Sequence, residues 1–229
     1  MICEASCYLI FTTVFPIIGN MAALAVFSSP LQHSVQLFKS GDIVNYNTLP
    51  NVFAGLNCLS WSFYGLILKN WYIIPVNAFG MTISLFIFMM TIGPIYSAQL
   101  GKKQLLYTIL WLVFNIALLV ILFSICVISI SNEHTKQLIM GYSSIFYLVV
   151  FYASPLQLLF KVIQNKDASH LFFPLIVTCF VNSIAWTFYG IAIDDLFLAL
   201  PNGFGILVSI VQMVLYIKYK PSHFIEVQE

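Results

Sequence analysis

Two tryptophans and two asparagines lie inside apolar stretches of this chain, and their side chains could bind a small polar molecule. They are Trp61, Asn77, Trp186 and Asn202. Each lies seven or eight residues from a short polar loop, which corresponds to about 10 to 12 Å along a helix. We therefore expect the four side chains in one layer, slightly outside the middle of a membrane.

An indole and an amide together suit a sugar. The apolar C–H face of a sugar ring can lie on an indole, and an amide offers the hydroxyls both donors and an acceptor. Two alternatives stay open: packing or interfacial anchoring for the tryptophans, and hydrogen bonds between helices for the asparagines, each worth about 0.6 to 2 kcal/mol. For Asn57 and Asn182, one helical turn before the tryptophans, packing between helices is the favoured interpretation.

The chain contains two copies of one unit. Residues 56–65 (LNCLSWSFYG) recur 125 residues later as residues 181–190 (VNSIAWTFYG). At the same offset, residues 29–32 (SPLQ) match residues 154–157. Chance does not supply so many identities at one spacing, so the layer of tryptophan and asparagine is itself duplicated.

Composition places both copies in a membrane. Hydrophobic residues make up 61% of the 229 residues and charged residues only 7%, against about 25% charged residues in soluble domains. The net charge is +1 and all nine basic residues are lysines, so arginine recognition of phosphate is absent and no nucleic-acid partner is expected. The expected partner is the lipid bilayer.

Seven apolar segments are long enough to cross about 30 Å of hydrocarbon. They lie near residues 8–31, 48–68, 71–96, 105–130, 138–163, 171–193 and 197–217. Backbone groups in hydrocarbon need internal partners and the segments lack the alternation of a barrel, so we predict an all-α membrane protein.

The repeat divides these seven transmembrane helices as 3+1+3. Residues 1–98 form the first three-helix repeat, 99–134 a linker helix with its flanking loops, 135–219 the second repeat and 220–229 a short cytosolic tail. The linker helix restores the direction of the chain, so the two repeats are parallel and related by an axis along the membrane normal.

Lysine positions predict the orientation. With the N-terminus outside, only Lys69 and Lys136 face outward, and seven lysines face the cytosol: Lys39, Lys102, Lys103, Lys161, Lys166, Lys218 and Lys220. The start of the chain lacks a basic region and a cleavage pattern, so the first apolar segment is expected to remain as a signal anchor.

Together these features resemble the eukaryotic SWEET sugar transporters. The resemblance is carried by the paired Asn-x-x-x-Trp-x-x-Tyr-Gly motif and by residues 201–205 (PNGFG) and 152–156 (YASPL). It implies that Trp61, Asn77, Trp186 and Asn202 bind the sugar. Two families share the architecture and stay open as alternatives: lysosomal PQ-loop amino-acid carriers and KDEL-type cargo receptors.

The resemblance also implies two gates. Four prolines would act as inner-gate hinges, each removing one helical hydrogen bond and permitting a kink: Pro30, Pro50, Pro155 and Pro174. Tyr64 and Asp195 match positions of the outer gate, and Lys69 in the neighbouring loop is the third residue expected there. Asp194 stands where many members have a basic residue, so Lys69 would have to serve both acids, or the loop charges are simply solvated.

No Asp, Glu or Lys lies well inside any apolar segment, and proton-coupled carriers usually need such a relay. This predicts facilitative uniport by alternating access, with no cofactor and no metal. A tryptophan in both copies makes the expected site nearly symmetric and narrow. A narrow site favours monosaccharides such as glucose. The spans lack a nucleophile paired with a base, so an enzyme is not expected. A plasma membrane or Golgi location, and a homo-oligomer, stay open.

Overall fold

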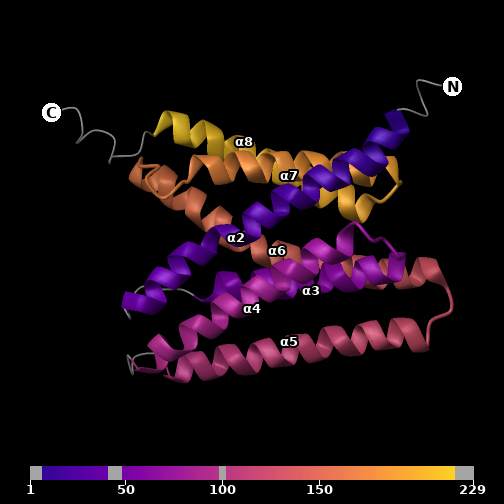
Figure 1. Cartoon of the computed structure of the whole chain (residues 1–229), viewed down its shortest axis with the longest axis horizontal. Coiled ribbons are helices and arrows are strands. Elements are labelled where there is room, and N and C mark those ends of the chain that lie inside the picture. Colours follow the sequence, from indigo (N-terminus) through magenta and orange to yellow (C-terminus); the bar gives the residue numbers. More distant parts are fainter. Residues whose placement is uncertain (1–6, 41–47, 98–101, 220–229) are drawn as a thin grey trace. The chain divides into compact units, whose positions relative to one another are not determined.

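The computed structural model describes residues 7–40, 48–97 and 102–219. Helices account for nearly all of these residues (Figure 1): η1 (Ile10–Val14), α2 (Phe15–Ser40), α3 (Leu49–Leu68), α4 (Ile73–Ser97), α5 (Lys102–Ile128), α6 (Glu133–Asn165), α7 (Phe173–Ala192) and α8 (Leu196–Lys218). The predicted tail at residues 220–229, including Lys220, lies outside the described residues.

Seven helices are long and apolar enough to cross a membrane, with η1 and α2 counted as one span. The predicted all-α class with seven spans is therefore confirmed. Two boundaries differ. The first span continues to Ser40 and α6 begins at Glu133, because hydropathy marks the apolar part of a helix and says nothing of its polar extensions.

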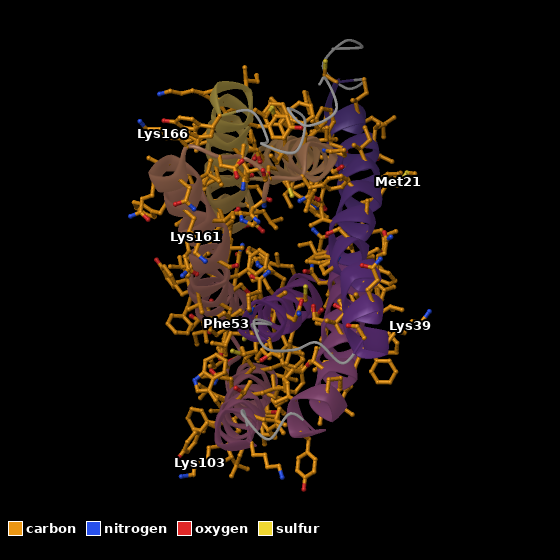
Figure 2. The ribbon with its side chains drawn as sticks, turned by 90° about the vertical axis from the view of Figure 1, so that its left-hand side faces the viewer. Met21, Lys39, Phe53, Lys103, Lys161 and Lys166 are labelled. Atoms are coloured by element: carbon orange, nitrogen blue, oxygen red, sulfur yellow. The ribbon has the colours of Figure 1, made fainter. Side chains whose placement is uncertain are left out.

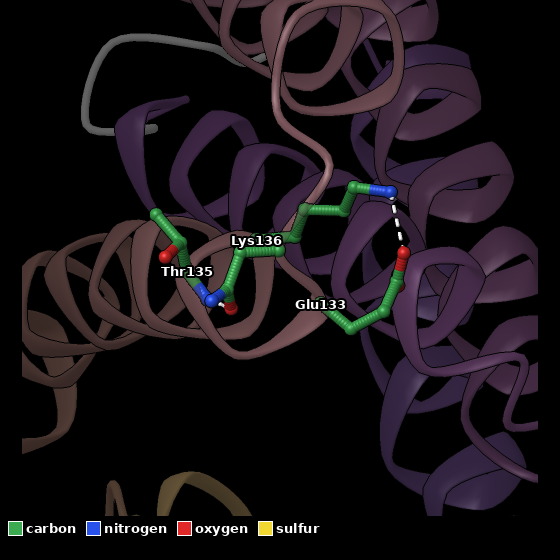
Figure 3. Close-up of polar contacts among 4 residues, drawn as sticks. Glu133, Thr135 and Lys136 are labelled. Carbon is green, nitrogen blue, oxygen red and sulfur yellow. Dashed lines mark hydrogen bonds and ion pairs between the residues drawn. The ribbon is translucent and has the colours of Figure 1, made fainter.

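The early start of α6 has a local cause (Figure 3). The Asn132 side chain accepts a hydrogen bond from the Thr135 N–H at 3.1 Å, and it thereby satisfies a donor of the first turn. Lys136 Nζ lies 2.6 Å from Glu133 Oε1 one turn along the helix. These polar contacts continue the helix beyond its apolar segment.

By their contacts the helices form two compact units. The α3–α5 unit comprises residues 27–151, and the α7–α8 unit comprises residues 152–229 together with residues 1–26. The chain passes between units inside α2, after Val26, and inside α6, after Phe151. These two crossing points are 125 residues apart, so the packing repeats with the sequence.

In the α3–α5 unit, α5, which is the helix predicted to be a linker, packs against α3 and α4. The buried core contains Val52, Leu56, Phe88, Leu105, Leu112, Leu119 and Tyr147. Tyr147 Oη on α6 donates to Asn115 Oδ1 on α5 at 2.9 Å, a bond between helices of the kind worth about 0.6 to 2 kcal/mol in membranes. The opposite side of α5 exposes apolar residues such as Leu106 and Phe114, as expected of a lipid-facing helix.

In the α7–α8 unit, the core lies among the ends of α6, α7 and α8. Its buried members are Leu159, Val162, Ala168, Leu171, Ile176, Val208 and Leu215. The Ala168 N–H donates to the Tyr219 carbonyl at 3.0 Å, so the loop after α6 lies beside the end of α8. Lys166 and Lys218 are therefore at one end of this unit. Lys161 and Lys166 extend away from the ribbon in Figure 2.

Candidate functional site

The turns that join α3 to α4 and α7 to α8 have the same construction. Lys69 and Asp194, 125 residues apart, are left-handed, with φ values of 54° and 55°. The N–H of the next residue then donates a hydrogen bond to the carbonyl of a glycine in the preceding helix. Asn70 bonds to Gly65 at 2.9 Å, and Asp195 bonds to Gly190 at 2.8 Å. Each turn closes the end of one helix and starts the next helix in the opposite direction.

Close packing next to each turn sets the register of the two helices. A Cβ at Gly65 would lie 3.1 Å from Ile73 Cβ. Trp61 precedes Gly65 by four residues and Asn77 follows Ile73 by four, so both lie about 6 Å deeper. The two side chains therefore share one level of the unit.

The second unit repeats this register. A Cβ at Gly190 would lie 3.0 Å from Leu198 Cβ, and Trp186 and Asn202 are again four residues away on either side. The structure thus brings one tryptophan and one asparagine of the predicted set to a common level within each unit.

Both asparagines are anchored to their own helix. The Asn77 amide donates to the Ile73 carbonyl and the Asn202 amide to the Leu198 carbonyl, each at 2.8 Å. Neither Oδ1 accepts a hydrogen bond from the residues that the structure describes. The alternative of a bond between helices is therefore not what these side chains do here, and an acceptor and a second N–H remain for a ligand.

Both tryptophans are packed inside the protein. Trp61 and Trp186 are each 6% exposed, and each makes an edge-to-face contact with the tyrosine three residues later, at centroid distances of 5.4 and 5.8 Å. Interfacial anchoring would leave the ring open to lipid. Trp71, which is 74% exposed, fits that role, and the two site tryptophans do not.

Asn57 and Asn182 leave their side-chain oxygens without a hydrogen bond from the described part of the chain. Their Oδ1 atoms are buried and have no hydrogen-bond partner among the described residues. Neither oxygen therefore bonds to a neighbouring helix, and packing between helices stays a prediction for these two residues. A buried amide oxygen without a partner lowers the stability of the folded protein by roughly 1 to 3 kcal/mol. A hydrogen bond from a polar ligand to this oxygen would recover part of that free energy.

One helical turn deeper than the tryptophan and asparagine, an aromatic side chain packs against a glycine in each unit. A Cβ at Gly80 would lie 2.7 Å from Cys58 Sγ and 2.8 Å from the Phe27 ring. The sequence motif contained Cys58, but its neighbours Phe27 and Gly80 could not be inferred, because they come from two other helices, α2 and α4. The equivalent residues in the other unit are Tyr152, Ser183 and Gly205.

Two stretches of the chain match one protein family, described as "Sugar efflux transporter for intercellular exchange". They are residues 13–96 and residues 138–223, and they begin 125 residues apart, at the offset of the internal repeat. The chain belongs to this family, the SWEET transporters. It is an integral, multi-pass membrane protein.

Individual relatives carry the same name. The bidirectional sugar transporter SWEET2a of Oryza sativa subsp. indica is 30% identical over 200 residues, 87% of this chain and 81% of that protein. SWEET4 of the same subspecies is 28% identical over 214 residues, 92% and 80% of the two chains. A solved eukaryotic SWEET transporter superposes with a TM-score of 0.83 at 26% identity, covering 93% of this chain and 98% of that one.

The four SWEET-type prolines differ in their structural setting. Pro30 and Pro155 lie inside α2 and α6, where each removes a helical hydrogen bond. Pro50 and Pro174 lie in the first turns of α3 and α7. The expectation that all four remove a helical bond is wrong for this second pair, because a first-turn N–H has no partner within the helix in any case.

The residues expected at the outer gate also differ in their setting. Tyr64 is buried, and its Oη accepts a hydrogen bond from Gln137 Nε2 at 3.3 Å. Asp195 is only 3% exposed and caps α8, accepting from the Leu198 N–H at 3.2 Å. Lys69 is exposed. The interpretation of the loop charges as simply solvated therefore fails for Asp195, because its carboxylate is a buried helix cap.

Proposed function

We propose that this chain carries sugars across a membrane in both directions by facilitative uniport. Its relatives are named bidirectional sugar transporters, and its family is one of sugar efflux transporters. The observation that carries the proposal is the duplicated level that an indole and an asparagine with an unused acceptor share in each unit.

Trp61, Asn77, Trp186 and Asn202 are the sugar-binding residues of this proposal. The indoles provide apolar faces for the ring of the sugar, and the asparagines bond its hydroxyls. Asn57 and Asn182 add a second pair of amides, one turn away and each with an orphaned oxygen. A site of neutral amides and indoles suits an uncharged polyol better than an amino-acid zwitterion, which would need charged partners.

Uniport follows from the distribution of charge. In the described helices no Asp, Glu or Lys lies in the central turns, so a proton or sodium relay through the middle of the protein has no carrier there. The gradient of the sugar then sets the direction of transport.

Alternating access needs joints, and the best candidates lie in α2 and α6. The chain passes from one compact unit to the other directly after Val26 and Phe151. Pro30 and Pro155 follow these two residues by four positions, so their missing N–H groups would have bonded to the carbonyls of Val26 and Phe151. We assign hinge motion to these two prolines, and a static role at the inner gate to Pro50 and Pro174.

Reconstitution of the purified full-length chain into proteoliposomes tests the function. We expect saturable flux of labelled glucose, galactose or fructose, with less flux of sucrose, and no change on imposing a pH or sodium gradient. Accumulation against a sugar gradient would refute uniport. Peptide binding without any sugar flux would favour a KDEL-type receptor, and amino-acid flux a PQ-loop-type carrier.

A further inference from the structure

Gly19 on α2 lies directly against the indole of Trp186 on α7. A Cβ atom at Gly19 would lie 2.8 Å from Trp186 Nε1 and 3.1 Å from both Cδ1 and Cε2. These three atoms belong to the five-membered ring. The ring therefore rests on bare backbone, at a place where any side chain on α2 would displace it.

Neighbouring aromatic rings hold the two helices together at this point. The Phe15 and Phe188 rings meet at 5.5 Å, and Phe11 stacks on Phe188 at 5.6 Å. The obstacle to a Cβ at Gly19 is one side chain, not backbone. A methyl group there would turn the indole while α2 and α7 keep their places.

The first repeat is built differently at the matching position. Ser144 on α6 follows Gly19 by 125 residues, and its counterpart tryptophan is Trp61. Ser144 is fully buried, and its Oγ has no hydrogen-bond partner among the described residues. Where the second repeat has bare backbone, the matching position of the first repeat carries a side chain with an unsatisfied hydroxyl.

We propose that Gly19 is a positioning residue that sets the orientation of the Trp186 indole and, through it, the affinity for the sugar ring. This proposal rests on the proposed function, because it takes Trp186 as a sugar-stacking residue. Gly19 itself touches no sugar. Its effect is the loss of Trp186 stacking when a side chain is added.

The test compares Gly19→Ala and Gly19→Ser with Gly93→Ala in the full-length reconstituted protein. A Cβ at Gly93 would meet nothing within 4 Å, and all three glycine replacements raise helix propensity. We expect both Gly19 variants to raise the KM for glucose roughly three- to tenfold, the loss of an aromatic contact, with Vmax and abundance little changed. Gly93→Ala should match the parent.

A double-mutant cycle shows whether Gly19 acts through the ring. The smaller ring of Trp186→Phe leaves room for a methyl group, so Gly19→Ala should raise KM much less in the Trp186→Phe background than in the parent. An equal rise in both backgrounds, or no rise in the parent, overturns the proposal. Normal sugar transport by both Trp186→Ala and Asn202→Ala would reject the sugar site itself. Loss of transport in these two variants, together with an unchanged KM in Gly19→Ala, would reject only the role of Gly19.

Discussion

The hydroxyl of Tyr152 lies 2.8 Å from the position that a Cβ atom of Gly205 would occupy. Ser183 Oγ lies 2.6 Å from the same position, so three helices meet where α8 has no side chain. The first repeat has the same meeting at Gly80. The contact therefore occurs twice with different residue types but in the same geometry: an aromatic side chain of the first helix of the repeat lies against a glycine of the third.

This contact predicts a difference between two glycines on one helix. Gly205→Ala should lower the free energy of unfolding by about 1 to 3 kcal/mol, the usual cost of overpacking. Gly203→Ala, at a position with nothing within 4 Å, should be neutral or stabilising. Thermal unfolding of both variants in detergent measures the difference. Equal melting temperatures would show that Tyr152 and Ser183 move aside without cost.

The asparagines should be needed for transport but not for folding. Asn202→Ala and Asn77→Ala remove only a bond to the carbonyl of the same helix, so each should cost at most about 1 kcal/mol of stability. We expect sugar flux to be abolished while surface abundance stays normal. Uptake assays with surface biotinylation separate the two quantities, and normal uptake by both variants would reject the proposed site.

Two substitutions of Asp195 distinguish its role as a helix cap from its proposed role in the outer gate. Asp195→Ala removes the acceptor for the Leu198 N–H and should cost about 0.5 to 2 kcal/mol of stability. Asp195→Asn keeps an acceptor, so we expect its melting temperature to remain close to that of the parent. With the cap intact, any loss of flux in Asp195→Asn measures the role of the charge. A melting temperature as low as that of the alanine variant would contradict the capping role.

The two classes of proline should respond differently to replacement. Pro155→Ala restores an N–H inside α6, and the regained helical bond of about 1 kcal/mol should stiffen the helix. We expect Vmax for sugar to fall several-fold at nearly constant KM. Pro174→Ala, in the first turn of α7, should change Vmax much less. Initial uptake rates of the two variants in proteoliposomes measure this difference. Equal rates would contradict the assignment of hinge motion to Pro155 and of a static role to Pro174.

Much of the fold follows from short-range patterns in the sequence. Hydropathy over about 20 residues locates the spans, since each must be apolar to cross the bilayer. The repeat then pairs Trp61 with Trp186. The distance of each tryptophan from its loop indicates its depth, because a helix rises by a constant amount per residue. Pro50 and Pro174 were placed less well, because the start of a helix depends on local geometry that hydropathy does not record.

The sequence by itself therefore determined the seven spans, the duplication and the common level of one tryptophan and one asparagine within each repeat. Only the tertiary structure decided what surrounds that layer. The contact between Gly19 and Trp186 joins residues from different repeats, and it exists because the first half of α2 packs within the α7–α8 unit. The unpartnered oxygens of Asn57 and Asn182 likewise depend on which groups neighbouring helices present. Such contacts are set by how helices pack side by side, and neither periodicity nor hydropathy carries that information.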